Sequence, residues 1–451
     1  MYDLGIIGAG PAGYVAAERA GERGMDTILF EKNEVGGVCL NTGCIPTKTL
    51  LHSAKVFNTI KEASLYGIET GEPSFNMDKI LSRKKKVVKV LTKGVENALK
   101  KRKVTVVRGE CSVSGSDQDR IILESGGEKY ECRDILVATG SQPFIPPVKG
   151  ADSGSVLTST ELLDVDSVPD SLAVIGGGYI GLEFACFFAS LGCDVTVVEM
   201  LEQIAPGMDG EIAAMLRKEL SELGISFSLG SKVTAVDGNK VVFEKDGEEG
   251  SVQGDWILMS VGRRPVTEGL GLENLSVELK NGAVSTDERC RTNHPHVYAA
   301  GDVNGRSMLA HTASREAEVA VNVISGKEDR MRYIAVPGVV YTEPEAASSG
   351  YTEEGLNQEG IDYDVFKLPM AFSGRFKAEY ERKNGMCKIL VGKKHREILG
   401  VHMIGGGCSE MIYGASIMIE TELRSSDVQE IIFPHPTVSE ILRETLLTDI
   451  P

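Results

Sequence analysis

The stretches LGIIGAGPAGYVAAERAGERGMDTILFEK (residues 4–32) and LAVIGGGYIGLEFACFFASLGCDVTVVEM (residues 172–200) follow one plan. Each holds an apolar run, a G-x-G-x-x-G loop, a segment of helix length and a second apolar run that ends in an acid. Because the spacing is the same in both copies, the sequence predicts an α/β chain with two strand–loop–helix–strand units. The repeated residues are Gly8, Gly10, Gly13 and Glu31 in the first copy and Gly176, Gly178, Gly181 and Glu199 in the second.

A loop of this kind can be a plain strand-to-helix turn, but its repetition together with the acid favours dinucleotide binding. The first glycine makes the tight turn, the second lets the backbone approach a pyrophosphate, and the third lets helix and strand pack closely. N–H groups at the start of the helix then hold the phosphates. We therefore predict two Rossmann-like domains, with Glu31 and Glu199 as acceptors for ribose hydroxyls. Glu199 would repel a 2′-phosphate, and no arginine follows it up to residue 210, so the second site should prefer NAD to NADP.

Composition narrows the choice of partners. The chain has 451 residues, and 48 Lys and Arg against 65 Asp and Glu give a formal charge of −17, which disfavours binding to nucleic acid or to an anionic membrane. The longest apolar stretch, residues 171–192, contains Glu183 and several glycines, so it predicts strand, turn and helix and no membrane span. The first residues predict a buried strand and no signal peptide. Nine scattered cysteines are typical of reduced thiols, so we expect a cytoplasmic protein.

A close cysteine pair lies in GGVCLNTGCIPTK (residues 36–48), which holds Cys39 and Cys44. Such a pair can be a structural bridge, two metal ligands, or a dithiol that opens and closes during turnover. A zinc site would need further Cys or His ligands at short spacing, and only His52 is near, so we predict no metal. The choice between a static and a redox pair stays open at this point.

With two dinucleotide loops and this cysteine pair, the chain resembles the flavin-dependent disulfide reductases of the pyridine nucleotide-disulfide oxidoreductase family. The likeness runs from IIGAGPAG (residues 6–13) to HPTVSE (residues 435–440), and within the family it is greatest to the dihydrolipoamide dehydrogenases. The resemblance implies FAD at the first loop, NAD at the second, and a homodimer. It also implies four segments: an FAD-binding domain with the redox disulfide (1–143), an NAD-binding domain (144–264), a second segment of the FAD or central domain (265–336) and a C-terminal α+β dimerisation domain (337–451).

The resemblance also implies roles for single residues. Cys39 and Cys44 form the redox disulfide, in which Cys39 meets the substrate thiol and Cys44 faces the flavin; a thiolate near a helix N-terminus has a lowered pKa. Lys48 lies beside the flavin N5 and pairs with Glu183. The further flavin contacts are Gly109, Thr139, Gly140, Ser141, Asp302, Met308, Leu309, Ala310 and His311. Tyr179 covers the flavin until the nicotinamide displaces it, and Gly262 and Val233 contact NAD.

The implied reaction is oxidation of protein-bound dihydrolipoamide to lipoamide. His435, held by Glu440 as an acid–base dyad, deprotonates the dithiol, the thiolate attacks Cys39, and ring closure leaves the cysteines reduced. Electrons pass from Cys44 through FAD to NAD+. The dyad reaches the disulfide from the partner subunit, so active sites are shared. The dithiol would arrive on the lipoyl-carrying protein of a multienzyme complex, either a 2-oxoacid dehydrogenase or the glycine cleavage system.

Two other functions compete with this interpretation. An NADPH-consuming reductase of a small disulfide such as glutathione shares the cysteine and histidine motifs, but Glu199 speaks against it. A purely structural subunit of a multienzyme complex would not need Cys39, Cys44 and His435. The basic stretch SRKKKVVKVLTKGVENALKKRK (residues 82–103) could be an anion-binding helix, but a solvated helix face is the simpler expectation.

Overall fold

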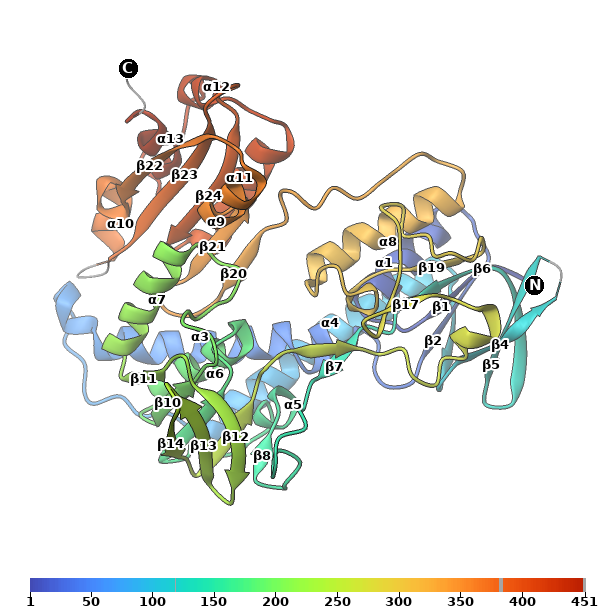
Figure 1. Ribbon diagram of the computed structural model, residues 1–451, viewed down its shortest axis with the longest axis horizontal. Helices are drawn as coiled ribbons and strands as arrows, with labels where there is room; N and C mark the ends of the chain where they lie inside the picture. The colour runs from blue at the N-terminus through green and yellow to red at the C-terminus, as the bar shows by residue number, and fades with distance from the viewer. Residues whose placement is uncertain (118, 381–383, 449–451) are drawn as a thin grey trace. The chain divides into compact units, whose positions relative to one another are not determined.

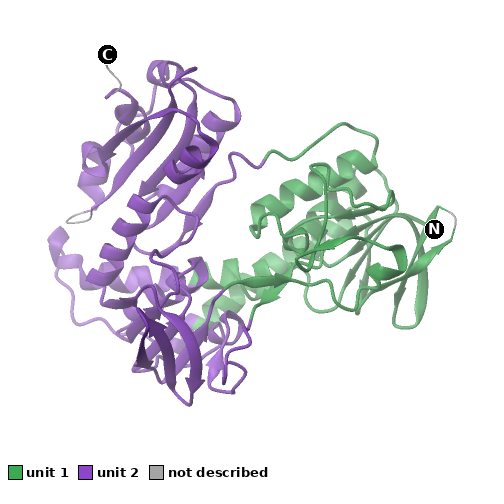
Figure 2. Ribbon diagram, viewed as in Figure 1, with its two compact units in different colours: residues 1–49, 81–144, 262–332 green, residues 50–80, 145–261, 333–451 purple. Residues whose placement is uncertain are grey.

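The computed structural model describes residues 1–117, 119–380 and 384–448, and it divides into two compact units (Figures 1 and 2). Unit 1 consists of residues 1–49, 81–144 and 262–332, and unit 2 consists of residues 50–80, 145–261 and 333–451. One unit can hold more than one domain, so the four predicted domain segments remain predictions.

Unit 1 is built on a sheet with the strand order β3-β2-β1-β6-β5-β4, and β19 also pairs with β6. The strands β1, β2, β3, β6 and β19 pair in parallel, whereas β4, β5 and β6 form an antiparallel meander. The bounds are β1 (Tyr2–Ile7), β2 (Thr27–Glu31), β3 (Thr105–Arg108), β4 (Ser112–Asp117), β5 (Arg120–Ser125), β6 (Glu128–Val137) and β19 (Val297–Ala299). A two-stranded ribbon, β7 (Ser141–Pro143) with β16 (Arg263–Pro265), completes the part relevant to the site.

The helices of unit 1 follow from local sequence. Helix α1 (Pro11–Glu22) starts with proline at its first position, where the missing N–H costs nothing, and it packs on α8 (Ala310–Ile324) through buried alanines. The short α2 (Gly37–Asn41) leads to α3 (Cys44–Lys61), and α4 (Met77–Lys101) is the long basic helix. The last two cross the unit boundary in the chain. Among the described residues, no helix combines the length and the apolar character that a bilayer span requires.

Unit 2 repeats the parallel arrangement in a sheet of order β11-β10-β9-β15-β8. In β1 and β2 Leu4 faces Thr27, and in β9 and β10 Leu172 faces Val195, so the two repeats also share their register. The prediction of an α/β fold with two Rossmann-like units is confirmed. The elements are β8 (Val156–Leu157), α5 (Ser159–Leu162), β9 (Ser171–Ile175), α6 (Tyr179–Ser190), β10 (Asp194–Val198), α7 (Gly210–Glu222), β11 (Ile225–Ser228), β15 (Trp256–Met259) and the antiparallel sheet β12 (Lys232–Asp237), β13 (Lys240–Lys245), β14 (Glu248–Gln253).

The rest of unit 2 is an antiparallel sheet of order β20-β21-β24-β23-β22 with helices packed on it. Its central strands β23 and β24 are almost entirely buried, and α11, α12 and α13 share one core cluster with them. The bounds are β20 (Gly338–Val340), β21 (Ala346–Gly350), α9 (Glu353–Glu359), β22 (Tyr363–Pro369), α10 (Gly374–Glu379), β23 (Met386–Gly392), β24 (Ile398–Ile404), α11 (Cys408–Glu420), α12 (Ser425–Glu430) and α13 (Glu440–Leu446).

Candidate active site

The first and third glycines of each loop are required by the backbone itself. Gly8 and Gly176 have φ values of 102° and 106°, in the left-handed region that favours glycine. A Cβ atom on Gly13 would lie 1.8 Å from the carbonyl oxygen of Gly8, and one on Gly181 would lie 2.1 Å from that of Gly176. Any side chain at these positions would push the helix away from its strand.

The second glycines have the opposite surroundings. A Cβ atom on Gly178 would meet nothing within 4 Å, and one on Gly10 would meet only the Cα atom of Gly37 at 3.9 Å. Both residues are the N-caps of their helices, so bare backbone faces open space where helix N–H groups point outward. Both loops therefore fit the phosphates of a dinucleotide.

Each predicted acid is anchored to its own loop. The Oε2 atom of Glu31 accepts a hydrogen bond from the N–H of Ala9 at 2.7 Å, and the Oε2 atom of Glu199 accepts one from Gly177 at 2.6 Å. The Oε1 atoms accept from the N–H two residues further along the chain, at 2.8 Å in both copies. The side chains are nearly buried, and each oxygen has a second lone pair for a ribose hydroxyl.

The two predicted redox cysteines come together and are fastened to the first loop. Cys39 lies in α2 and Cys44 starts α3; both are free thiols in this structure, and their side chains hydrogen bond to one another. The N–H of Gly36 donates to the carbonyl of Ala9 at 2.8 Å. A Cβ atom on Gly37 would lie 2.6 Å from the Cα atom of Gly10, so only glycine lets α2 start this close to the loop.

The acidity of Cys39 differs from the expectation. The hydrogen bond that the Cys39 thiol donates to Cys44, burial and the negative charge of a Cys44 thiolate raise the pKa of Cys39 far above its usual range, although the charge of Lys48 opposes the shift. The expected lowering of the pKa is therefore wrong for Cys39 in the dithiol state. Only Cys44 begins a helix, whereas Cys39 lies within α2 and hydrogen bonds to Cys44.

Three further predicted residues lie on α3 and α6. Lys48 is one helical turn after Cys44 and belongs to unit 1. Glu183 is buried in unit 2, where it accepts a hydrogen bond from the N–H of Tyr341 at 3.2 Å. Burial raises the pKa of Tyr179, the first residue of α6. The pairing of Lys48 with Glu183 and the cover that Tyr179 would form remain predictions.

The predicted flavin contacts of unit 1 lie at ends of its strands. The N–H of Gly109 donates to the carbonyl of Glu31 at 2.9 Å, directly after β3. Thr139 donates through its hydroxyl to the carbonyl of Val266 at 2.6 Å, and the carbonyl of Gly140 accepts from the N–H of Val266 at 3.0 Å. These contacts tie the end of β6 to the segment after β16.

An arginine that we did not predict from the sequence binds Ser141, which in turn binds Asp302. The hydroxyl of Ser141 donates to the Oδ2 atom of Asp302 at 2.5 Å. Arg263 donates to the hydroxyl of Ser141 at 2.7 Å and to its carbonyl at 2.8 Å. Burial lowers the pKa of Arg263, and the charge of Asp302 opposes this shift. The repeated strand-then-turn pattern around Arg263 was a signal, but its partner could not be inferred from spacing.

The remaining predicted contacts lie at the start of α8, at Gly262 and on β12. Met308, Leu309, Ala310 and His311 lie at the N-terminal end of α8, next to the short helix that starts at Asp302. The carbonyl of Gly262 accepts from the N–H of Phe144 at 3.0 Å. Val233 packs against a core cluster of unit 2. A role for any of them in binding a cofactor remains a prediction.

The predicted acid–base dyad is formed as a hydrogen-bonded pair. The Nδ1 atom of His435 lies 2.9 Å from the Oε1 atom of Glu440, and the N–H of Thr437 donates to Oε2 at 2.8 Å. The hydrogen bonds from Thr437 and then His435 lower the pKa of Glu440. The His435 side chain is 79% exposed, so its other nitrogen can meet a group from outside the chain.

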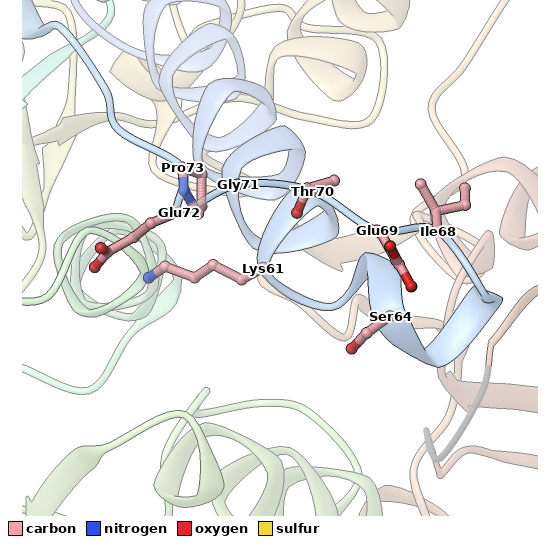
Figure 3. A pocket seen from close by; sticks show the side chains of 8 residues that line it. All are labelled: Lys61, Ser64, Ile68, Glu69, Thr70, Gly71, Glu72 and Pro73. Atoms are coloured by element: carbon pink, nitrogen blue, oxygen red, sulfur yellow. The ribbon is translucent and has the colours of Figure 1, made fainter.

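A cavity of about 480 Å³ lies elsewhere, on the loop after α3, and none of the predicted site residues line it (Figure 3). In that view Lys61 and Glu72 extend on the same side of the loop. Across the described ranges, no group of three or more His, Cys, Asp or Glu side chains could hold a metal ion.

Nearly the whole chain matches the profiles of one protein family. Residues 2–317 match the profile "Pyridine nucleotide-disulphide oxidoreductase", and residues 336–446 match its dimerisation domain. The chain belongs to this family. It therefore carries, beyond the two loops, the part of the family fold through which subunits pair.

Relatives cover the chain almost end to end. It is similar to "Dihydrolipoyl dehydrogenase" from Geobacillus stearothermophilus, with 37% identity over 97% of this chain and 94% of that protein. It is also similar to "Dihydrolipoyl dehydrogenase 1, mitochondrial" from Arabidopsis thaliana, with 40% identity over 99% of this chain and 90% of that protein. Among solved structures, LpdA from Mycobacterium tuberculosis matches with a TM-score of 0.92 and 25% identity, and each chain is covered completely.

Proposed function

We propose that this chain is a dihydrolipoamide dehydrogenase, which oxidises a protein-bound dihydrolipoyl group and passes its electrons through FAD to NAD+. The single observation that carries the proposal is the dithiol of Cys39 and Cys44 fastened to one of two equivalent dinucleotide loops. The relatives of that name, at 37% and 40% identity over nearly the full chain, support the same substrate.

The residues present fit both dinucleotides. Gly10 and Gly178 leave open space at a helix N-terminus, and Glu31 and Glu199 keep acceptor capacity beside them. We assign FAD to the first loop because the dithiol is attached to it, and NAD to the second. Held at the first loop, FAD would supply an acceptor for the two electrons of the dithiol, and NAD+ held at the second loop would supply the final acceptor of a hydride. The charge of Glu199 disfavours a 2′-phosphate, which supports NAD over NADP.

The chain's own groups manage the thiol chemistry. In the oxidised enzyme Cys39 and Cys44 form a disulfide. His435 accepts the proton of one substrate thiol, and the resulting thiolate attacks Cys39, which breaks that disulfide and releases Cys44 as a thiolate. The second substrate sulfur then displaces Cys39 and gives its proton to the departing Cys39 sulfur, so the substrate leaves as a cyclic disulfide and the cysteine pair holds the two electrons. Glu440 fixes the tautomer of His435 and stabilises its charged form.

The exposed dyad supports an active site shared between two subunits of a homodimer. The His435 side chain is 79% exposed, although a base that deprotonates a substrate thiol is expected to lie in a sheltered site. His435 also lies in the dimerisation domain, residues 336–446. We infer that His435 of one subunit serves Cys39 of the other. The dithiol would be presented by the lipoyl-carrying protein of a multienzyme complex.

Turnover with free dihydrolipoamide tests the proposed function. Purified enzyme should form NADH at 340 nm from dihydrolipoamide and NAD+, and only slowly from NADP+. NADPH-driven reduction of glutathione disulfide, without dihydrolipoamide oxidation, would favour the reductase of small disulfides instead.

Mixed dimers test the shared site. Neither His435→Ala nor Cys44→Ser should be active alone, because each homodimer lacks one required group in both sites. Subunit exchange between the two should restore activity in one site of each hybrid dimer. Absence of recovery in verified hybrids would place both groups in one subunit.

A further inference from the structure

Helix α4 is strongly basic, although the protein as a whole is acidic. The whole chain has a net charge of −17, but in SRKKKVVKVLTKGVENALKKRK (residues 82–103) Glu96 is the single acid. The helix buries Leu81, Thr92 and Leu99 on one side. Lys84 is buried as well, but most of the basic side chains of this helix are exposed, where the simple expectation was a solvated face.

Three lysines form an exposed stripe on this helix. Lys86, Lys89 and Lys93 are exposed and follow one another at intervals of three and four residues, so they share one face. We call them the lysine stripe. Within the described ranges none of the three forms an ion pair, whereas Arg102, near the end of the same segment, pairs with Glu22. Val90, which is 61% exposed, adds an apolar side chain beside them.

The lysine stripe runs beside the helices that carry the dithiol. Within unit 1 the hydroxyl of Thr92 donates to the Oδ1 atom of Asn41 at 3.4 Å, and Asn41 is the last residue of α2, which contains Cys39. Arg83 donates to the carbonyl of Thr49 in α3, which begins at Cys44, at 3.0 Å. The two contacts are made from residues 83 and 92 of the helix segment that carries the stripe, so a body attracted to the stripe arrives next to the elements that hold the reacting sulfurs.

We propose that the lysine stripe docks an acidic carrier domain while that domain delivers its dihydrolipoyl group to Cys39. This inference rests on the proposed function and names the charge of the partner and the face that receives it. Positive charge at one place on a strongly negative surface attracts an acidic domain there and repels it elsewhere, which raises the rate of productive encounter. An extended polyanion, such as nucleic acid or an anionic membrane, would also meet the negative remainder of the surface.

Two charge-reversal variants of equal size test the proposal. The stripe variant is Lys86→Glu/Lys89→Glu/Lys93→Glu, and the control is Lys100→Glu/Lys101→Glu/Lys103→Glu at the end of the helix near Glu22. The probes are an isolated, chemically reduced lipoyl domain of net negative charge, the same domain with its acids neutralised, and free dihydrolipoamide.

In the stripe variant kcat/KM for the acidic lipoyl domain should fall about tenfold at low salt, and its dependence on ionic strength should flatten. The control variant, the neutralised domain and free dihydrolipoamide should show changes of no more than about twofold. Dimer mass and the melting temperature of both variants establish that the fold is intact.

Equal losses in both variants would mean a general effect of net charge and would overturn the proposal, as would an unchanged rate in the stripe variant. Binding of a DNA duplex or of phosphatidylserine vesicles that only the stripe variant loses, with unchanged carrier kinetics, would assign the stripe to another partner. Failure of wild-type enzyme to oxidise free dihydrolipoamide would instead refute the proposed function itself.

Discussion

The loops at residues 8–13 and 176–181 share one backbone conformation, but the chain that follows each repeat takes a different course. Both open with a glycine at positive φ, both crowd the third glycine, and in both an N–H of the loop donates to the acid that follows the next strand. After the first acid the chain turns back through Gly36 and Gly37 and places the dithiol helix against the loop. After the second acid it runs into α7 instead.

The helices after the two loops differ as well. Helix α1 has Pro11 and Val15 where α6 has Tyr179 and Glu183, and α1 buries small alanines where α6 buries phenylalanines. The shape of the loop is thus a property of the backbone, and both copies have it. The two copies differ in what is attached to them: a dithiol in the first, and a tyrosine and a buried glutamate in the second.

The largest expected effect is the loss of one activity, that of the first copy, while the activity of the second copy is kept. Cys44→Ser should lower dihydrolipoamide oxidation by at least about 10³-fold, because it removes one sulfur of the pair that exchanges with the substrate. The second loop lies outside this change, so NADH should still reduce an artificial electron acceptor through the bound FAD. Loss of both activities, with FAD content unchanged, would mean that the two copies do not work separately.

The second expected effect is on stability and concerns the buried ion pair at the start of α7. Lys388, 1% exposed, places its Nζ atom 2.8 Å from Asp209, the N-cap of α7, and 3.3 Å from Glu211. Lys388→Met would leave a buried carboxylate without its cation and should cost about 3–5 kcal/mol of unfolding free energy. Lys367→Met is the matched control, because it removes an exposed partner of the same Glu211 and should cost less than about 1 kcal/mol. Urea denaturation of both variants measures the difference, and equal costs would contradict a special role for burial.

The same cluster gives a pH dependence. Burial lowers the pKa of Lys388, but the hydrogen bonds and charges of Asp209 and Glu353 outweigh this and raise it above its ordinary value of 10.5. A raised pKa in the folded state means that the contribution is complete below pH 10.5 and is lost as the pH rises beyond it. The stability difference between wild type and Lys388→Met should therefore stay constant from pH 7 to 9.

The third expected effect distinguishes the glycines within a loop. Gly181→Ala brings a Cβ atom to 2.1 Å from a backbone oxygen and should cost about 1–3 kcal/mol of stability. Gly178→Ala meets no protein atom within 4 Å and should melt like wild type, but should weaken NADH binding about tenfold or more because it blocks the approach of the phosphates. Melting curves measure the stability of both variants, and NADH titrations measure their affinity. Normal NADH binding by Gly178→Ala would show that the second loop is not the NADH site. Gly13→Ala and Gly10→Ala should repeat the pattern for FAD.

The smallest expected effect is on cofactor choice. Glu199→Gln removes the charge that opposes a 2′-phosphate, so the ratio of kcat/KM for NADP+ to that for NAD+ should rise about tenfold, or 1.4 kcal/mol. Glu31→Gln, the same change in the first loop, should leave this ratio unaltered. A rise in both variants would mean that the two loops are not divided between cofactors.

Local pattern predicted the repeated units, while long-range partners had to come from the structure. The spacing of Gly176, Gly181 and Glu199 is set by one loop and one helix, so the sequence contains it. The placement of Arg263 on Ser141 and of Lys388 on Asp209 joins segments far apart in the chain, for which spacing gives no register. The raised pKa of Cys39 was missed for a similar reason, because it depends on a hydrogen bond and burial rather than on the helix terminus.

The most direct test of the division between the two copies is the anaerobic half-reactions, followed by flavin absorbance in a stopped-flow instrument. Dihydrolipoamide should reduce FAD in wild type and in Gly178→Ala but not in Cys44→Ser. NADH should reduce FAD in wild type and in Cys44→Ser, and much more slowly in Gly178→Ala at low NADH. Loss of both half-reactions in either variant, with FAD still bound, would contradict the assignment of the dithiol to the first loop and NAD to the second.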